Sequence, residues 1–119
     1  MAATEIGAWG EERAANYLRL RGYRILARNC RYRQGELDIV ARKGDYIVFI
    51  EVKLRKNNDF GEARDFVTYS KQQKCIAAAQ MWLAENETEL QPRFDVIEVY
   101  APNGMSSRGL KINHIINCF

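Results

Sequence analysis

The spacing of apolar residues predicts two helices. Near the N-terminus, apolar residues recur every three to four positions, which is typical of a helix with one buried face. We expect this helix over residues 4–21, with Thr4 as its cap and Gly22 as its stop. The residues expected to face the core are Ala14, Tyr17 and Leu18. A similar spacing predicts a second helix over residues 70–85, with Ser70 as its N-cap.

Runs of β-branched and aromatic residues predict five strands. We expect them at residues 23–33, 36–42, 46–54, 93–100 and 110–119, with Gly44 and Asp45 as a two-residue turn. Short connections favour antiparallel pairing of the first three strands, and the helix before the fourth permits a crossover. We therefore predict an α/β fold, with a mixed central sheet flanked by helices. The length suits a single domain over residues 1–119.

Composition narrows the functional classes only slightly. The 119 residues carry a formal net charge of +3, which is too small by itself to indicate a nucleic-acid partner. The distribution is more informative, because seven arginines and no acid lie between Arg13 and Arg33, whereas five acids and one base lie between Glu85 and Glu98. A positive pole of this kind attracts polyanions, although a solvated arginine-rich face has the same composition.

Cysteine usage and hydropathy favour a cytoplasmic protein with no membrane partner. Cys30, Cys75 and Cys118 are far apart and lack the spacing of a disulfide framework or a zinc site. Free thiols in a reducing compartment are the expected state. The N-terminal residues lack the pattern of a signal peptide, and no apolar run is long enough to cross a bilayer.

Charged residues interrupt the two apolar strands of the expected hairpin near one end. If Gly44 and Asp45 form the turn, Asp38 lies opposite Glu51, with their β-carbons about 4.5–5.5 Å apart. Two facing carboxylates are destabilising unless a divalent cation, or a neighbouring cation such as Lys53, neutralises them. Two explanations fit this pattern: a metal or catalytic site, and a structural ion pair at the margin of the sheet.

Two other acidic residues invite a specific interpretation. Glu11 lies beside the buried face of the first helix, where it could reach the sheet, although the helix dipole also favours a glutamate in a first turn. On the fourth strand, Arg93 and Asp95 alternate with apolar residues, and we expect them to form a local ion pair.

The hairpin motif resembles a nuclease signature. Asp38, twelve intervening residues and then Glu51-Val52-Lys53 resemble the D…(D/E)-x-K pattern of restriction-endonuclease-like nucleases, whose αβββαβ core has the predicted element order. The stretches "GEERAANYLRLRGYRILARNCRYRQGELDIVARKGDYIVFIEVKLR", "FVTYSKQQK" and "RFDVIEV" resemble the bacterial YraN family. Members of that family are largely uncharacterised and similar to archaeal Holliday-junction resolvases. The resemblance covers nearly the whole chain.

The resemblance implies a set of site residues. Asp38 and Glu51 would be metal ligands and Lys53 the catalytic lysine, while Glu11 matches a glutamate that resolvase-like members add to the metal site. The backbone carbonyl of Val52 could supply a further ligand. Carboxylate oxygens are hard ligands, so the expected cofactor is Mg²⁺ or Mn²⁺. The implied reaction is phosphodiester hydrolysis.

Basic residues near this motif would then contact the phosphates of a nucleic acid, with DNA as the expected partner. They are Arg31, Arg33, Arg55, Lys56 and Lys71. For Lys71, at the start of the second helix, a solvated lysine is an equally good explanation. Because resolvases cut two strands symmetrically, the resemblance also implies a homodimer.

Three functions are compatible with these observations. The first is a metal-dependent DNA endonuclease acting on branched or structured DNA. The second is a non-catalytic nucleic-acid-binding module on the same fold, and the third is an interaction domain whose acids form an internal ion-pair network. The set of Glu11, Asp38, Glu51 and Lys53 favours the first, because binding alone does not require acids near phosphates.

Overall fold

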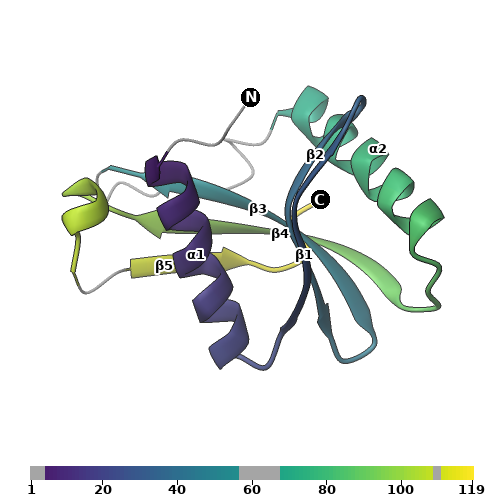
Figure 1. Ribbon diagram of the computed structural model, residues 1–119, viewed down its shortest axis with the longest axis horizontal. Helices are drawn as coiled ribbons and strands as arrows, with labels where there is room; N and C mark the ends of the chain where they lie inside the picture. The colour runs from purple at the N-terminus through teal and green to yellow at the C-terminus, as the bar shows by residue number, and fades with distance from the viewer. Residues whose placement is uncertain (1–4, 57–67, 109–110) are drawn as a thin grey trace.

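Two helices cover opposite faces of a five-stranded sheet (Figure 1). The computed structural model describes residues 5–56, 68–108 and 111–119. Its elements are α1 (Glu5–Leu20), β1 (Arg24–Tyr32), β2 (Gly35–Lys43), β3 (Tyr46–Arg55), α2 (Tyr69–Glu85), β4 (Gln91–Tyr100), the 3₁₀ helix η2 (Gly104–Ser106) and β5 (Lys111–Ile115). The predicted α/β class and the order of the elements are confirmed.

The strands lie in the sheet in the order β1-β2-β3-β4-β5. β1, β2 and β3 pair antiparallel, β3 and β4 pair parallel, and β4 and β5 pair antiparallel. The parallel pair is joined through α2, as expected for a crossover connection. The predicted mixed sheet is therefore confirmed.

The core has one layer on each side of the sheet. On the α1 side, the buried residues include Ala14, Ala15, Leu18, Ile39, Val48, Ile50, Ile97 and Val99. On the α2 side, they include Leu37, Val40, Ile47, Phe49, Cys75, Ala78, Ala79 and Trp82. Because β3 is covered on both faces, its residues 47–50 are all buried, which explains their unbroken apolar run.

The ends of the helices agree only in part with the prediction. Gly22 follows α1 with φ of 86°, a conformation that glycine adopts readily, and it ends the helix as expected. Thr4, the expected cap of α1, lies outside the described residues. The predicted N-cap Ser70 is wrong, since α2 begins at Tyr69 and its N-cap is Thr68, whose hydroxyl accepts the N–H of Lys71. Neither described helix combines the length and apolar character needed to cross a membrane.

The fifth strand is shorter than predicted. It covers residues 111–115 in place of 110–119, and the residue that follows it, Ile116, is 55% exposed. Asn117 has φ of 55°, which takes the chain out of the extended conformation just after the strand. Leu110, the first residue of the predicted strand, lies outside the described residues.

The β1–β2 hairpin bends halfway along its length. Asn29 has φ of 52° and is not paired with Asp38, and the register of the β1–β2 pairing shifts by one residue between Ile25 and Ala27. The pairing of β2 with β3 follows the predicted register from the turn as far as Ile39 opposite Ile50. Asp38 and Glu51 are the next residues in that register, but the bend ends the pairing just before them.

The tip of the hairpin, from Tyr32 to Gly35, lies against α2 (Figure 1). A β-carbon on Gly35 would lie 2.5 Å from the carbonyl oxygen of Lys74, so the two backbones meet at a distance that only glycine allows. Beyond the bend, the hairpin therefore belongs to the α2 side of the molecule. The second half of β3 faces a gap in the sheet where β2 has departed.

Candidate active site

Asp38 lies at the bend, where its side chain takes the place of a backbone hydrogen bond between β2 and β3. Its Oδ2 accepts the backbone N–H of Val52 at 2.9 Å. The N–H and C=O of a strand residue face the same edge, so the Val52 carbonyl faces the gap as well. Burial raises the pKa of Asp38 to about 7, and the negative charges of Glu51, Glu11 and Glu36 act in the same direction. The bend therefore gathers four carboxyl groups within electrostatic range.

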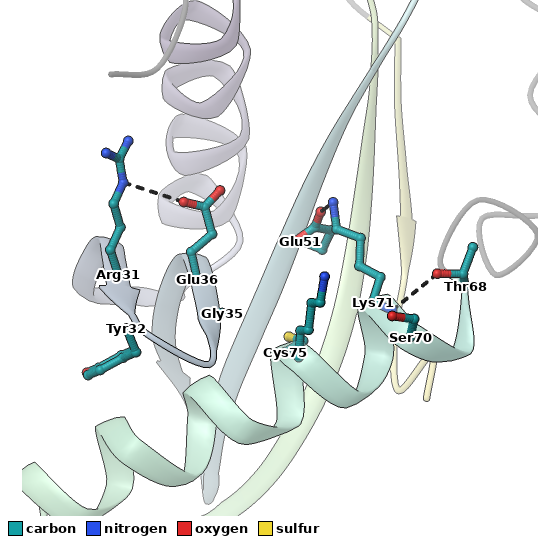
Figure 2. Close-up of a pocket in the computed structure, with 10 residues that line it drawn as sticks. Arg31, Tyr32, Gly35, Glu36, Glu51, Thr68, Ser70, Lys71 and Cys75 are labelled. Carbon is teal, nitrogen blue, oxygen red and sulfur yellow. Dashed lines mark hydrogen bonds and ion pairs between the residues drawn. The ribbon is translucent and has the colours of Figure 1, made fainter. Parts of the chain in front are cut away.

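Glu51 is buried in the gap, with 7% of its surface exposed, and two lysines contact it. The Lys71 Nζ lies 2.7 Å from Glu51 Oε1, and the Lys53 Nζ lies 3.4 Å from the same oxygen. Lys53 comes from the same face of β3, whereas Lys71 reaches across from the first turn of α2 (Figure 2). The carboxylate at the centre of the motif is thus neutralised within the protein.

The two lysines at Glu51 differ in their protonation properties. Burial lowers the pKa of Lys53, and the neighbouring Lys71 lowers it further, against the opposing effect of Glu51. Burial is also the largest single influence on Lys71 and disfavours its charged form, but the hydrogen bonds to Glu51 and Lys53 and the charges of Glu51 and Asp38 together raise the pKa of Lys71. Lys53 therefore has the environment that a proton-accepting lysine requires, and Lys71 remains a cation.

Glu11 is held at the bend by two donors. It is 6% exposed, and its Oε1 accepts hydrogen bonds from Arg28 Nε at 3.2 Å and from Asn29 Nδ2 at 2.9 Å. The left-handed conformation of Asn29 directs its side chain toward α1. Glu11 is thus close enough to raise the pKa of Asp38, and its carboxylate joins α1 to the bend.

The donor set fits a hard divalent cation in its chemistry. Among the residues that the structure describes, no three acidic, histidine or cysteine side chains are arranged as a metal-binding group. Asp38 and Glu51 nevertheless supply carboxylate oxygens of the kind that Mg²⁺ and Mn²⁺ prefer. A cation between them would remove the repulsion that raises the pKa of Asp38. Within the protein, Lys71 and Lys53 supply positive charge to Glu51, and Arg28 supplies it to Glu11.

A cleft of about 470 Å³ adjoins Glu51, between the hairpin tip and the start of α2 (Figure 2). Its lining residues are Arg31, Tyr32, Gly35, Glu36, Glu51, Thr68, Ser70, Lys71, Lys74 and Cys75. Three of them are basic and two are acidic. Sequence reasoning missed Lys74 and Ser70, although the spacing of Lys71 and Lys74 places both on one side of a helix.

The basic residues expected to contact phosphates occupy different environments. Arg31 lines the cleft and forms a 3.5 Å ion pair with Glu36, while Arg33 is exposed in the hairpin turn. Lys56 is exposed at the end of β3. Arg55 faces inward instead, and its Nε donates to the fully buried Glu98 at 2.9 Å. The structure brings Arg31 and Lys71 to the cleft but gives Arg55 an internal partner.

The predicted ion pair on β4 is confirmed. Two guanidinium nitrogens of Arg93 donate to the two oxygens of Asp95, at 3.0 and 2.9 Å. His114 and the backbone N–H of Asn117 also bond to this fully buried carboxylate. Burial alone would raise the pKa of Asp95, but these hydrogen bonds outweigh it and hold the pKa below its usual value. This cluster lies on the α1 side of the sheet, opposite the cleft.

Comparison with known proteins gives consistent matches. The family model described as "Uncharacterised protein family UPF0102" matches residues 10–99. A UPF0102 protein of Caldanaerobacter subterraneus is 43% identical over 116 residues, covering 96% of this chain and 93% of the relative. A UPF0102 protein of Syntrophomonas wolfei is 46% identical over 116 residues, covering 97% of both chains. The similarity therefore includes the hairpin, α2 and the cleft.

Proposed function

We propose that the chain, which belongs to the UPF0102 family, is a metal-dependent endonuclease that hydrolyses phosphodiester bonds in DNA. The main observation in support of this proposal is that two carboxyl groups, those of Asp38 and Glu51, lie beside Lys53 at the gap in the sheet. Burial and mutual repulsion raise the pKa of Asp38 to about 7, while burial and Lys71 lower the pKa of Lys53. Perturbed groups of both kinds next to a cleft are typical of catalytic sites.

The residues divide the reaction between them. Asp38 and Glu51 would hold Mg²⁺ or Mn²⁺, and the Val52 carbonyl and Glu11 would be further oxygen donors. When bound, such a cation supplies Lewis-acid activation of the phosphodiester and of the attacking water. Lys53 accepts a proton from the water or stabilises the negative charge that develops on the phosphate.

Branched or structured DNA is the proposed substrate, and a homodimer is the proposed assembly. Both rest on the resemblance to Holliday-junction resolvases. The basic side chains at the cleft, Arg31, Lys71 and Lys74, support a polyanionic substrate next to the carboxyl groups.

A non-catalytic nucleic-acid-binding module is the second candidate, and one observation favours it. Lys71 and Lys53 neutralise Glu51, and Arg28 neutralises Glu11, so these two of the three acids have basic partners within the protein. Such a module would bind nucleic acid in a salt-dependent manner and cut none.

Cleavage of labelled DNA distinguishes the two candidates. Holliday junctions, flaps, and single- and double-stranded DNA are incubated with the protein in Mg²⁺, in Mn²⁺ and in EDTA. We expect metal-dependent cleavage, reduced on the order of 10²-fold or more in Asp38→Asn, Glu51→Gln and Lys53→Met. Asp45→Asn is the matched control, because Asp45 is exposed in the turn between β2 and β3, away from the bend. Equal cleavage by all four variants would exclude the proposed site.

A further inference from the structure

Lys71 makes the shorter of the two lysine contacts to Glu51, although it is the more exposed lysine. Its Nζ lies 2.7 Å from Glu51 Oε1, and 46% of its side chain is exposed, compared with 19% for Lys53. Lys53 is two residues from Glu51 on the same strand, so its position follows from the backbone. Lys71 comes from α2 and reaches Glu51 only through its extended side chain (Figure 2).

The position of Lys71 also makes it part of the cleft. Both Lys71 and Glu51 line the cleft, so a cation that approaches Glu51 from there meets the Lys71 ammonium group first. A carboxylate oxygen that bonds to a lysine is less available to a metal ion, because the ammonium group and the metal ion compete for the same negative charge. Removing Lys71 from Glu51 would return one uncompensated positive charge to the cleft.

The other lining residues suit a phosphate group. Lys74 and the Ser70 hydroxyl lie beside Lys71, and Arg31 lies across the cleft with Glu36 as its acidic neighbour. Side chains form this phosphate subsite. The backbone N–H of Lys71 at the start of α2 does not contribute, since it donates to the Thr68 hydroxyl.

The two walls of the cleft contact each other through their backbones. Gly35 on the hairpin tip meets the Lys74 carbonyl of α2 at backbone contact distance. A switch of Lys71 between two partners would therefore require a change of side-chain rotamer only.

We propose that Lys71 occupies the place of a divalent cation on Glu51 and transfers to a nucleic-acid phosphate in the cleft when the cation binds. This inference rests on the proposed function and adds to it a phosphate subsite that the metal controls. Metal and nucleic acid then bind with positive coupling, and the coupling is reciprocal. Lys71 is thus a positioning residue.

The first test measures Mn²⁺ binding by calorimetry in the absence of nucleic acid. Lys71→Met removes the competing cation, so we expect Mn²⁺ affinity to rise about fivefold. Lys74→Met is the matched control, because Lys74 lines the same cleft three residues along α2, and we expect it to change the affinity by less than about twofold. Unchanged or weaker Mn²⁺ binding by Lys71→Met would overturn the proposal.

The second test measures the binding of a fluorescent single-stranded oligonucleotide. Every protein in this test carries Lys53→Met, so that the oligonucleotide is not cleaved. In EDTA, proteins with and without Lys71→Met should bind equally, because Glu51 retains Lys71. Mn²⁺ should tighten binding about fivefold more when Lys71 is present, as expected for one lysine–phosphate contact. An equal gain in both proteins would overturn the transfer of Lys71.

Asp38→Asn separates failure of this inference from failure of the proposed function. If the native protein binds no Mn²⁺, or binds it as tightly after Asp38→Asn, the metal site itself is wrong and the proposed endonuclease fails with it. If Asp38→Asn abolishes Mn²⁺ binding while Lys71→Met leaves it unchanged, only the role of Lys71 fails.

Discussion

Asp38 makes an unfavourable contribution to folding at neutral pH. Burial and the charge of Glu51 raise its pKa from the ordinary 3.8 to about 7. Because the folded-state pKa lies above the unfolded one, protonation favours the folded state. The resulting stability is complete below about pH 4 and is lost as the pH rises through about 7. A carboxyl group retained at this cost is expected where charge is needed for function.

Asp38→Asn should therefore stabilise the protein in a pH-dependent way. Asparagine keeps an acceptor for the Val52 N–H and removes the charge. At pH 8 we expect the free energy of unfolding to rise by roughly 2–4 kcal/mol, and we expect the gain to disappear near pH 4. Denaturant unfolding across this pH range measures it, with exposed Asp45→Asn as the control. A variant less stable than the native protein at pH 8 would contradict the prediction.

Asp95→Asn should have the opposite effect. Its hydrogen bonds to His114 and Arg93 hold the pKa of Asp95 below its ordinary value, so this group stabilises the fold above about pH 4 and loses that contribution in acid. We expect Asp95→Asn to lower the free energy of unfolding at pH 7 by about 3 kcal/mol, with a smaller loss at pH 3. The same denaturant experiments test it, and a loss that grows toward acid pH would refute it.

At the level of elements, the packing of the hairpin tip on α2 depends on Gly35. A β-carbon there would meet the Lys74 backbone at 2.5 Å, whereas a β-carbon on Gly10 would meet the flexible end of the Leu54 side chain at 2.6 Å. We expect Gly35→Ala to destabilise the protein by about 1–3 kcal/mol. Gly10→Ala should cost less, because the side chain can move and alanine favours the helix.

Thermal unfolding of the two glycine variants measures this difference. Gly35→Ala should also weaken oligonucleotide binding, since it displaces one wall of the cleft. If the two variants lost equal stability, the close backbone contact between the hairpin tip and α2 would not be a determinant of the fold.

The parts of the fold that follow from local chemistry were predictable from the sequence. Gly44 has φ of 58°, and the pairing of Lys43 with Tyr46 gives the register inferred from a two-residue turn. The position of α2 in the chain likewise followed from apolar spacing. These features depend on residues close together in the chain.

The features that complete the candidate site were not predictable in this way. The bend depends on Asn29 in a left-handed conformation, for which asparagine itself is the only sequence signal. The contact between Lys71 and Glu51 depends on how α2 packs against the sheet, which apolar spacing does not specify. The register inferred from the turn holds as far as Ile39 opposite Ile50, but the predicted pairing of Asp38 with Glu51 is absent, and Asp38 bonds to the Val52 N–H instead.

At the level of the whole molecule, the positive pole is weaker than the sequence suggests. Arg19 and Arg28 form ion pairs with Glu12, and Arg31 forms one with Glu36. Arg33, by contrast, is exposed in the hairpin turn next to the cleft. The field that a polyanion meets therefore depends on a few residues around the cleft more than on the arginine count.

Arg33 and Arg55 should consequently respond differently to substitution. Arg33→Ala should weaken nucleic-acid binding and reduce the slope of log affinity against log salt by about one, with stability nearly unchanged.

Arg55→Met should instead lower the free energy of unfolding by about 2–4 kcal/mol, because Glu98 is fully buried and loses a charged partner. Salt titrations and denaturant unfolding measure the two effects, and the reverse pattern would contradict the assignment.

The order of the strands in the sheet has a consequence for folding kinetics. Each strand pairs with the strand that follows it in the chain, so most pairings close short loops. A fold with such local contacts has a low contact order and is expected to fold fast. The β2–β3 hairpin, with its two-residue turn, is of a kind that forms within about 1–10 μs. We expect this hairpin to bring Asp38 near Glu51 before α2 packs on the sheet and supplies Lys71. Early folding at neutral pH therefore proceeds against charge repulsion, and mild acid should accelerate it.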